Sequence, residues 1–441
     1  MNIEEEIKNR IKNTEELIKQ VKDKTTMAYL EGCYSLKCDY ESINELDKAC
    51  YYADIVIDLL VHNKTVYPDN KETRDKINKL WVTSYDTKAR NGDFEAFCIA
   101  LEWNRPIHKQ FYLPRARLLK KHGIVQGIQD LIDDKLDLLV LNCPPRCGKT
   151  TIGLFLQVLL GGMCPDESIL GAGHSVGLIQ SFYGEIMNII DGDEYRYHEI
   201  FPNNKIVNKS AEYLYLDLNK SRRFHTYNYV SIEAGGTGKV QAERLLYCDD
   251  LVKDVEQANN PDRLEKLYYN YTGTIEDRKI QRACKDGVYR PCPEIHINTP
   301  WSLHDVTSRV VENAKQDDMS RVRIVSIPCY DENGESNFMY DYGKGFNTKY
   351  YRDMEIAEDP VIFSAKYLMQ PIERDGLVFN KENISFYNEL PGEEPDRIVG
   401  YADVSHGGDD FFSLPIGYVY GNEVYIEKVL FKNKFGGDDY I

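Results

Sequence analysis

The chain has 441 residues, of which 42% are hydrophobic and 28% are charged, and its formal net charge is −17. This length leaves room for two or three domains with a large buried core, and the composition is that of a globular protein. The acidic balance argues against a surface coated with positive charge for nucleic-acid binding, although it is compatible with a local basic track.

Eleven cysteines are scattered along the chain. They show neither paired CxxC spacing nor a neighbouring histidine cluster, so neither a disulfide framework nor a zinc site is predicted. A reducing cytoplasm fits such cysteine usage best. No apolar run reaches the length of a membrane span, and the acidic first residues do not form a signal peptide. We therefore expect no membrane partner.

The first hundred residues are predicted to be helical. Ile3, Ile7 and Ile11 recur at helical spacing among Glu and Lys. Further helices are predicted over residues 50–61, 71–85 and 94–103. No chemistry-bearing motif occurs here, so residues 1–105 are interpreted as a helical accessory or docking region.

A boundary is predicted near Asn104–His108, followed by a helix over residues 116–134. Between them, Gln110 precedes Phe111 and Tyr112, so that an amide and an aromatic ring could hold an adenine. Surface packing of the two aromatic residues explains the same pattern equally well.

The segment that organises the rest is Leu138-Leu-Val-Leu-Asn-Cys-Pro-Pro-Arg-Cys-Gly-Lys-Thr-Thr151. It predicts a buried strand over residues 138–141, a tight loop, and a helix over residues 150–160. Gly148-Lys149-Thr150 is the distal half of a phosphate-binding loop, although Cys143 stands where the full pattern has a glycine. In such loops backbone N–H groups and a helix N-terminus face the phosphates, while the lysine pairs with the β- and γ-phosphates and the threonine hydroxyl ligates Mg²⁺.

The residues expected to bind ATP follow from this loop and the preceding amide. They are Gln110, Pro145, Arg146, Cys147, Gly148, Lys149, Thr150 and Thr151.

Strands and helices alternate after the loop. Strands are predicted over residues 168–172, 244–250, 294–298 and 321–327, helices over 177–190, 261–272, 305–314 and 363–370, a strand hairpin over 213–216 and 223–232, and a loop over 331–350. Such alternation is typical of a doubly wound α/β fold with a mostly parallel sheet.

The strand Leu245-Leu-Tyr-Cys-Asp249-Asp250 ends in two adjacent carboxylates. Asp249 is expected to hold Mg²⁺, and Asp250 is expected to polarise the attacking water as a catalytic residue. One strand is predicted between the loop strand and this acidic strand, as in ATPases with an additional strand at that position.

Thr299 ends the next strand, where its hydroxyl could bond the γ-phosphate and report its loss. A plain turn set by Pro300 is the alternative. The glycine-rich run over residues 235–239 has no helix behind it and is interpreted as a polar loop beside the site.

Three basic groups are candidates for a DNA track, or else solvated faces. They are Arg115, Arg117, Lys120 and Lys121; Lys220, Arg222 and Arg223; and Arg278, Lys279 and Arg282. Residues 390–396 have the composition of a linker, and strands are predicted over 397–403, 412–420 and 423–431.

In order and spacing, these motifs resemble the large terminase subunit of tailed bacteriophages and prophages, from about Tyr112 to the end. The resemblance rests on five segments: residues 144–150, 237–250, 298–305, 367–371 and 376–379. It implies a P-loop ATPase of the additional-strand type, an RNase H-like nuclease domain, and the domain boundaries 1–105, 106–375, 376–395 (linker) and 396–441.

The resemblance also implies a function. It is that of a homo-oligomeric, pentameric ring on a capsid portal protein that hydrolyses ATP to translocate double-stranded DNA, together with a small terminase subunit, in the cytoplasm of the infected host. Arg146 matches the family's arginine that reaches the γ-phosphate and would be catalytic in cis, whereas a salt bridge to a neighbouring loop is its alternative.

The implied nuclease would cut concatemeric DNA with two Mg²⁺ or Mn²⁺ ions. Asp403 matches its first metal-binding carboxylate, and Asp409 could assist. The family's other metal carboxylates lie further along than Ile441. A fragment, a split subunit or a missing nuclease is therefore expected, and this chain is expected to hydrolyse ATP without cutting DNA.

Two other functions account for some of the same residues. A helicase-like DNA translocase would share the ATP site, although no second ATPase lobe is visible after residue 330. A non-catalytic packaging scaffold would follow if Cys143 and Asp250 mark a degenerate ATP site.

Overall fold

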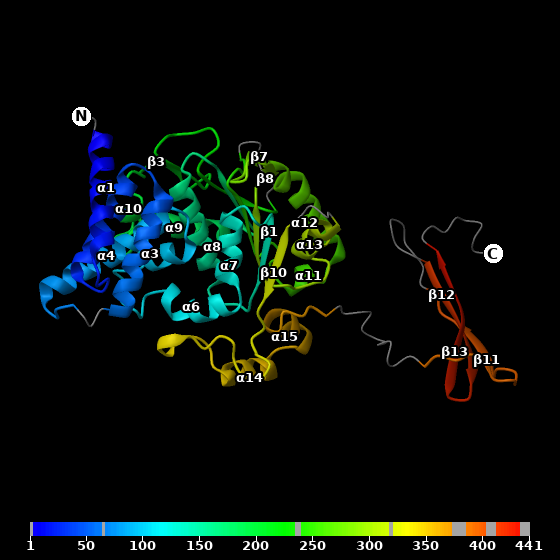
Figure 1. Cartoon of the computed structure of the whole chain (residues 1–441). Helices are drawn as coiled ribbons and strands as arrows, with labels where there is room; N and C mark the ends of the chain where they lie inside the picture. Colours follow the sequence, from blue (N-terminus) through cyan, green and yellow to red (C-terminus); the bar gives the residue numbers. More distant parts are fainter. Residues whose placement is uncertain are drawn as a thin grey trace. The chain divides into compact units, whose positions relative to one another are not determined.

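The computed structural model describes residues 3–63, 67–233, 240–316, 321–372, 385–402 and 412–432. The chain divides into two compact units, Met1–Glu373 and Arg374–Ile441 (Figure 1). Among the helices of the described part, none is both long enough and apolar enough to cross a membrane.

The first unit begins with five helices, of which four were predicted and one, α2, was not predicted as a separate helix. They are α1 (Ile3–Gln20), α2 (Met27–Ser42), α3 (Leu46–Asn63), α4 (Lys71–Arg90) and α5 (Phe94–Leu101). Thr26, Asn70 and Asp93 precede α2, α4 and α5, and each side chain accepts a backbone N–H of the first turn. These caps explain where the helices start.

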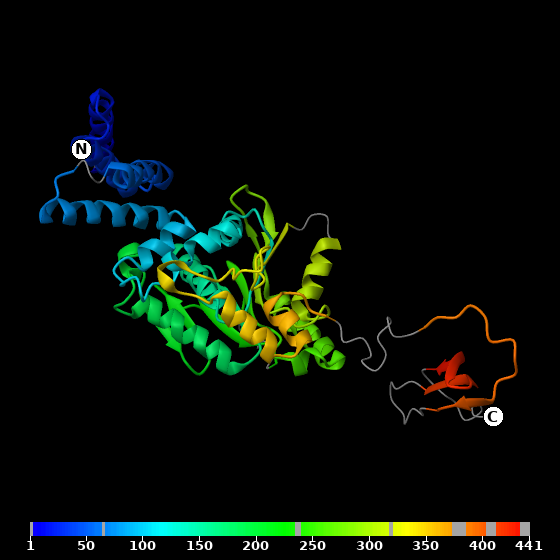
Figure 2. The ribbon, with the colours of Figure 1, turned by 90° about the horizontal axis from the view of Figure 1, so that it is seen from below.

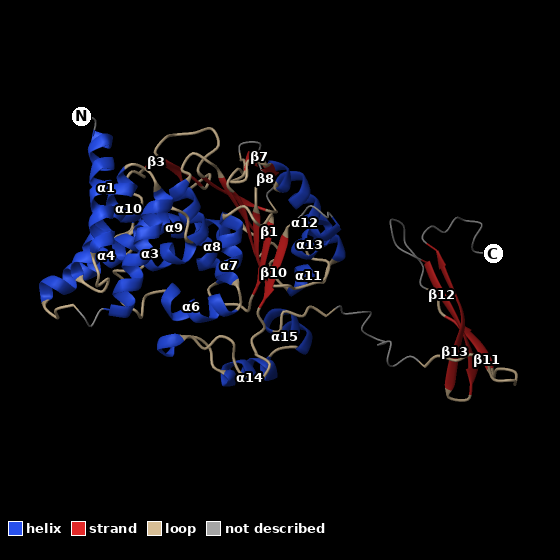
Figure 3. Cartoon of the chain, in the orientation of Figure 1, coloured by secondary structure: helices blue, strands red, loops and turns tan. Residues whose placement is uncertain are grey.

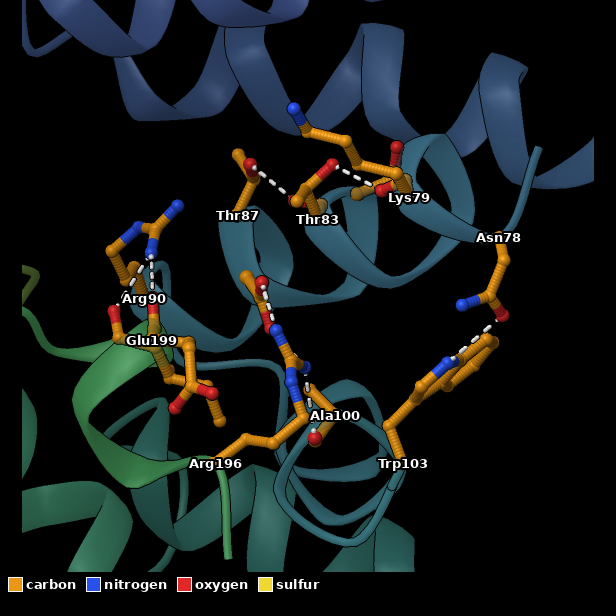
Figure 4. A network of polar contacts seen from close by, with 12 residues as sticks. Asn78, Lys79, Thr83, Thr87, Arg90, Ala100, Trp103, Arg196 and Glu199 are labelled. Carbon is orange, nitrogen blue, oxygen red and sulfur yellow. Dashed lines mark hydrogen bonds and ion pairs between the residues drawn. The ribbon is translucent and has the colours of Figure 1, made fainter. Parts of the chain in front are cut away.

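Helices α4 and α5 are joined to the rest of the unit by buried polar contacts (Figure 4). Arg196 pairs with Asp86 of α4 through two hydrogen bonds of 2.9 Å and donates to the Ala100 carbonyl of α5. Arg90 donates to the Glu199 and Ile200 carbonyls. A bidentate arginine–carboxylate pair fixes orientation as well as distance, so these helices have a defined position on the sheet-containing part.

Two helices lead into the sheet, α6 (Tyr112–Lys121) and α7 (Ile124–Ile132). The predicted single helix over residues 116–134 is therefore wrong. Gly123 between them has φ +73°, a conformation that an α-helix cannot continue through and that glycine adopts without strain.

The central sheet has eight strands in the order β10-β1-β9-β6-β2-β5-β4-β3. Its strands are β1 (Leu138–Asn142), β2 (Ile169–Gly173), β3 (Ile206–Ser210), β4 (Tyr215–Leu218), β5 (Tyr227–Ser231), β6 (Leu245–Asp249), β9 (Glu294–Asn298) and β10 (Val322–Ser326). All pairings from β10 to β5 are parallel, and β4 and β3 continue the sheet in antiparallel fashion. The mostly parallel α/β sheet and the additional strand, β9, between β1 and β6 are as predicted.

Helices cover both faces of this sheet (Figure 3). One face packs against α8 (Lys149–Met163) and α9 (Val176–Asp191), followed by the short α10 (Tyr197–Ile200). The other packs against α12 (Pro261–Thr274) and α13 (Val306–Gln316), with α11 (Val255–Ala258) before them. A Cβ on Gly153 of α8 would lie 2.4 Å from the Tyr247 ring, so this glycine sets how closely α8 approaches the sheet.

Several short elements were not predicted. Besides β3, α10 and α11, they are the 3₁₀ helices η1 (Glu276–Arg278) and η2 (Asp341–Gly343), the hairpin of β7 (Gln281–Ala283) and β8 (Tyr289–Pro291), and the helix α14 (Thr348–Ala357), which precedes the predicted last helix, α15 (Pro360–Tyr367). The predicted loop over residues 331–350 is packed, because Phe338 and Tyr340 are buried in the main core. Residue Asp341 of η2 pairs with Arg117 of α6 at 3.2 Å, and the two elements lie side by side (Figures 1 and 2).

The second unit is described by itself as a three-stranded antiparallel sheet in the order β11-β12-β13. Its strands are β11 (Arg397–Gly400), β12 (Phe412–Tyr420) and β13 (Glu423–Lys432). The hairpin with its turn at Gly421 is as predicted. Asp403 and Asp409, and the motif over residues 376–379, lie outside the described residues.

Candidate nucleotide site

The predicted phosphate-binding loop joins β1 to α8 at the carboxyl edge of the sheet. Gly148 precedes the first turn of α8 with φ +94°, and a Cβ there would lie 2.3 Å from the Phe111 ring. Arg146 also has a positive φ, +66°. The loop thus bends sharply enough to bring the N-terminus of α8 to the tip of β1, which is the geometry an anion site needs.

Lys149 is buried at the start of α8, with 8% of its surface exposed. Its Nζ donates to Asp250 Oδ1 at 2.9 Å and to Thr299 Oγ1 at 2.6 Å. Burial alone would lower the pKa of Lys149, but the carboxylates of Asp250 and Asp249 outweigh it and leave that pKa raised. The lysine is therefore a charged group held at the point where β1, β6 and β9 end.

The two carboxylates after β6 have different surroundings. Asp249 is buried and accepts the Tyr247 hydroxyl at 2.7 Å, whereas the Asp250 side chain is 31% exposed. Burial and the charge of Asp250 raise the pKa of Asp249 to about 7, against the opposing effects of Lys149 and of a hydrogen bond with Thr150. Thr150 and Asp249 together offer the hydroxyl and carboxylate oxygens that Mg²⁺ prefers, so these residues fit the predicted ion.

Thr299 follows β9, and its backbone N–H donates to Asp250 Oδ1 at 3.0 Å. The register places Asp249 opposite Ile297 and Asn142 opposite Asn298, so the tips of the three strands are level. The structure thus brings together Lys149, Asp250 and Thr299, with Asp249 and Thr150 beside them.

Two residues, Arg115 and Tyr340, support the loop from outside, and neither was predicted as a nucleotide-site residue. Arg115 Nε and the Tyr340 hydroxyl both donate to the Cys147 carbonyl, at 3.3 and 3.0 Å. The Arg115 guanidinium lies over the rings of Phe111 and Tyr340, at 4.5 and 4.6 Å. The tyrosine-rich composition of residues 331–350 is the signal that could have indicated a packed segment.

Two residues that were predicted to contact the nucleotide, Gln110 and Arg146, lie outside the group formed by Lys149, Asp250 and Thr299. Gln110 is buried, and its amide nitrogen donates to the backbone carbonyls of Glu102 and Arg105 at 3.2 and 2.7 Å. This nitrogen is therefore already engaged within the protein. The Oε1 atom of Gln110 is buried without a hydrogen-bond partner within the described ranges. Arg146 is exposed, and its side chain makes no ion pair with any residue that the structure describes.

The other predicted loop residues differ in exposure. Cys147 and Cys143 are buried, and Pro145 and Thr151 are partly exposed. The thiols of the two cysteines face each other, and this contact, together with burial, raises the pKa of Cys143. Cys143 thus fills the place of the missing glycine as a small core residue.

Part of the predicted basic track is engaged inside the protein. Arg115 supports the loop, Lys279 pairs with buried Glu294 at 3.0 Å, and Arg282 pairs with Asp134. These three side chains are not free for DNA in the described structure, since an ion pair or packed ring already holds each of them. For them, these contacts show a structural role, and a role as a DNA track stays a prediction.

A second polar cluster lies where α12 packs on β9, away from the phosphate-binding loop. Glu294 Oε1 accepts from His296 Nε2 at 2.5 Å and from the Tyr271 hydroxyl, and its Oε2 accepts from Lys279. Cys248 completes a group with metal-ligating atoms. The ammonium group of Lys279 already offsets the carboxylate charge, so the cluster is interpreted as a buried ion pair in the support of β9.

Comparisons with known proteins gave only structural matches. No protein-family model and no curated protein sequence matches the chain. The large terminase of bacteriophage HK97 is 13% identical, with a TM-score of 0.41 over 76% of this chain and 67% of that one. The large terminase of the thermophilic bacteriophage D6E in complex with ADP is 12% identical, with a TM-score of 0.35 over 73% of this chain and 69% of that one.

Proposed function

We propose that this chain is the ATP-hydrolysing subunit of a bacteriophage DNA-packaging motor. The observation that carries the proposal is the convergence of Lys149, Asp250 and Thr299 at the tips of β1, β6 and β9. The terminase resemblance of the motifs supplies the DNA-packaging part of the proposal.

Each residue of the site has a role in this proposal. Lys149 pairs with the β- and γ-phosphates, for which it exchanges its contact with Asp250. Asp250 orients and polarises the attacking water, and Thr299 bonds the γ-phosphate. Arg146, exposed at the loop apex, grips the γ-phosphate oxygens in cis.

Thr150 and Asp249 are the residues that would hold Mg²⁺. The bound ion would neutralise charge on the phosphate oxygens. Cys147, Gly148 and Thr151 bind through their backbone N–H groups, which the left-handed Gly148 directs toward one point, whereas Pro145 has no N–H and shapes the loop.

The macromolecular part of the proposal follows the family resemblance. The substrate moved is double-stranded DNA, the assembly is a homo-oligomeric ring on a portal protein, and a small terminase subunit is a further partner. The proposed regions are the helical region 1–105, the ATPase region 106–375, the linker 376–395 and the start of a nuclease domain at 396–441, and the place of action is the host cytoplasm.

The test is phosphate release from ATP by the purified chain, with and without double-stranded DNA. Lys149→Ala should lower the turnover by roughly 100-fold or more while leaving the circular dichroism spectrum unchanged. Lys349→Ala is the matched control, because Lys349 is 79% exposed and, among the residues that the structure describes, pairs with Asp353 alone, on the same helix face. Equal turnover in wild type and Lys149→Ala would contradict the proposal and support a packaging scaffold.

The same preparation separates a motor from a helicase. A packaging motor should hydrolyse ATP on blunt duplex DNA without releasing a labelled strand. Release of the strand would favour the helicase-like translocase.

Nuclease activity has a test of its own, because Asp403 and Asp409 lie outside the described residues. We expect the chain alone to leave plasmid DNA intact in Mn²⁺. Cleavage that disappears in Asp403→Ala would overturn this expectation and assign the nuclease to this chain.

A further inference from the structure

Asp250 has an uncommon backbone conformation, with φ +44°. Positive φ is disfavoured for residues with a side chain and persists where surrounding contacts hold it. Asp250 is therefore a residue whose position depends on its neighbours.

Four contacts hold Asp250. Its N–H donates to the Ile297 carbonyl at 2.9 Å, and its Oδ1 accepts from the Thr299 N–H and from Lys149. The fourth is at its carbonyl oxygen, which accepts from Nδ1 of His174 at 2.9 Å. Because a carbonyl oxygen can only accept, Nδ1 of His174 must carry the hydrogen.

His174 lies at the tip of β2, the strand on the other side of β6 from β9. The contacts of Thr299 and Ile297 reach Asp250 from the β9 side, whereas His174 reaches it from the β2 side. The His174 imidazole, just after β2, therefore holds the Asp250 peptide from the β2 side of β6, which is opposite to the β9 side.

A group that positions another must itself be held. The His174 carbonyl accepts the Ser231 hydroxyl at 3.3 Å, which ties it to the tip of β5. The next residue, Ser175, caps α9 by accepting the Leu178 N–H, and the preceding Gly173 carbonyl accepts the Ile232 N–H. The backbone around His174 is therefore fixed by the end of β5 and by the start of α9, independently of Asp250.

We propose that His174 is a positioning residue that keeps Asp250 directed at the nucleotide. The proposal rests on the ATPase function proposed above. When Lys149 turns to the phosphates, the Asp250 carboxylate loses one of its two donors. The His174 contact involves only the Asp250 backbone, so it persists and maintains the left-handed turn that sets the direction of the carboxylate.

The structure also offers a matched set of substitutions. In His174→Asn, the amide nitrogen stands about as far from Cα as Nδ1 does in histidine, so the donor is retained. In His174→Leu, similar bulk is kept without a donor. Nδ1 of His62 in α3 contacts the Asp58 carbonyl at 2.9 Å, so His62→Leu removes the same kind of hydrogen bond far from the site.

The experiment is steady-state ATP hydrolysis by the full chain, with kcat and KM determined separately. His174→Leu should lower kcat by roughly 10- to 100-fold with KM within about twofold, because the nucleotide is still bound but the water is poorly oriented. His174→Asn should recover most of kcat, and His62→Leu should match wild type. A general loss of folding would instead lower kcat in both His174 variants and shift their melting temperatures.

The outcomes separate this inference from the proposed function. If wild type hydrolyses ATP, Lys149→Ala does not, and His174→Leu keeps the wild-type kcat, then the positioning role of His174 is wrong and the ATPase stands. Equal loss in His174→Leu and His174→Asn would also contradict it. If wild type and Lys149→Ala turn over equally, then the ATPase proposal itself fails.

Discussion

Lys149 and Asp250 meet at 2.9 Å although 101 positions separate them in the chain. The contact joins the first turn of α8 to the end of β6, and the strand between β1 and β6 contributes Thr299 to the same group. When Lys149 pairs with phosphate, it no longer neutralises the Asp250 carboxylate beside it. The charge of Asp250 is therefore the property to test.

Asp250→Asn should keep the fold and nearly abolish hydrolysis. Asparagine retains an oxygen to accept the Thr299 N–H, so the turn persists, but the amide cannot polarise water as a carboxylate does. We expect kcat to fall by roughly 100-fold or more, with fluorescent ATP still bound at near wild-type affinity. Wild-type turnover in Asp250→Asn would remove this residue from the catalytic role.

Gly148→Ala should disrupt the loop. The added Cβ meets the Phe111 ring at 2.3 Å, and φ +94° is strained for alanine, so we expect the free energy of unfolding to fall by about 1–3 kcal/mol and ATP binding to be lost. Denaturant unfolding and fluorescent-nucleotide titration measure the two effects.

The control for Gly148→Ala is Gly184→Ala in the middle of α9. Nothing lies within 4 Å of a Cβ at Gly184, so alanine there should stabilise the helix by about 0.5–1 kcal/mol. Equal effects of the two substitutions would contradict the packed loop.

Tyr340→Phe should loosen the loop without unfolding the protein. It removes the hydroxyl that donates to the Cys147 carbonyl at 3.0 Å, while Arg115 keeps its own contact there. A hydrogen bond of this kind contributes about 0.5–1.5 kcal/mol, so KM for ATP should rise several-fold with a small change in kcat. Tyr342→Phe, on a side chain that is 67% exposed, is the control and should leave KM unchanged.

Glu294→Gln should change how stability depends on pH. Burial alone would raise the pKa of Glu294, but the charges of Lys279 and His296 and the hydrogen bonds of the cluster hold it well below the usual 4.5. As the pH falls through this usual value, the unfolded chain binds a proton that the folded chain does not. The contribution of Glu294 to the free energy of unfolding is therefore full above about pH 5 and decreases as the pH falls further.

Urea unfolding between about pH 6 and about pH 3.5 measures this dependence. Glu294→Gln should be less stable than wild type at pH 6, because Lys279 loses its partner, and its free energy of unfolding should fall less steeply toward low pH. Parallel pH profiles for wild type and variant would show that the pKa of Glu294 is not lowered.

The sequence by itself determined the local elements and the motif order. Apolar runs and capping residues set the helices and the buried strands, since a strand buried on both faces must be continuously apolar. Gly148-Lys149-Thr150 and Asp249-Asp250 could be identified because phosphate and metal chemistry restricts the residue types at such places. The resemblance to additional-strand ATPases also predicted a strand between the loop strand and the acidic strand in the sheet. That strand is β9, which follows the acidic strand β6 in the chain.

Only the tertiary structure decided which distant residues complete the site. Arg115 and Tyr340 meet at the Cys147 carbonyl, and His174 reaches the Asp250 carbonyl, through contacts for which no local spacing exists. The chemistry of a side chain can be identified from the sequence, whereas hydrogen bonds to backbone carbonyls depend on where the sheet places the strand ends.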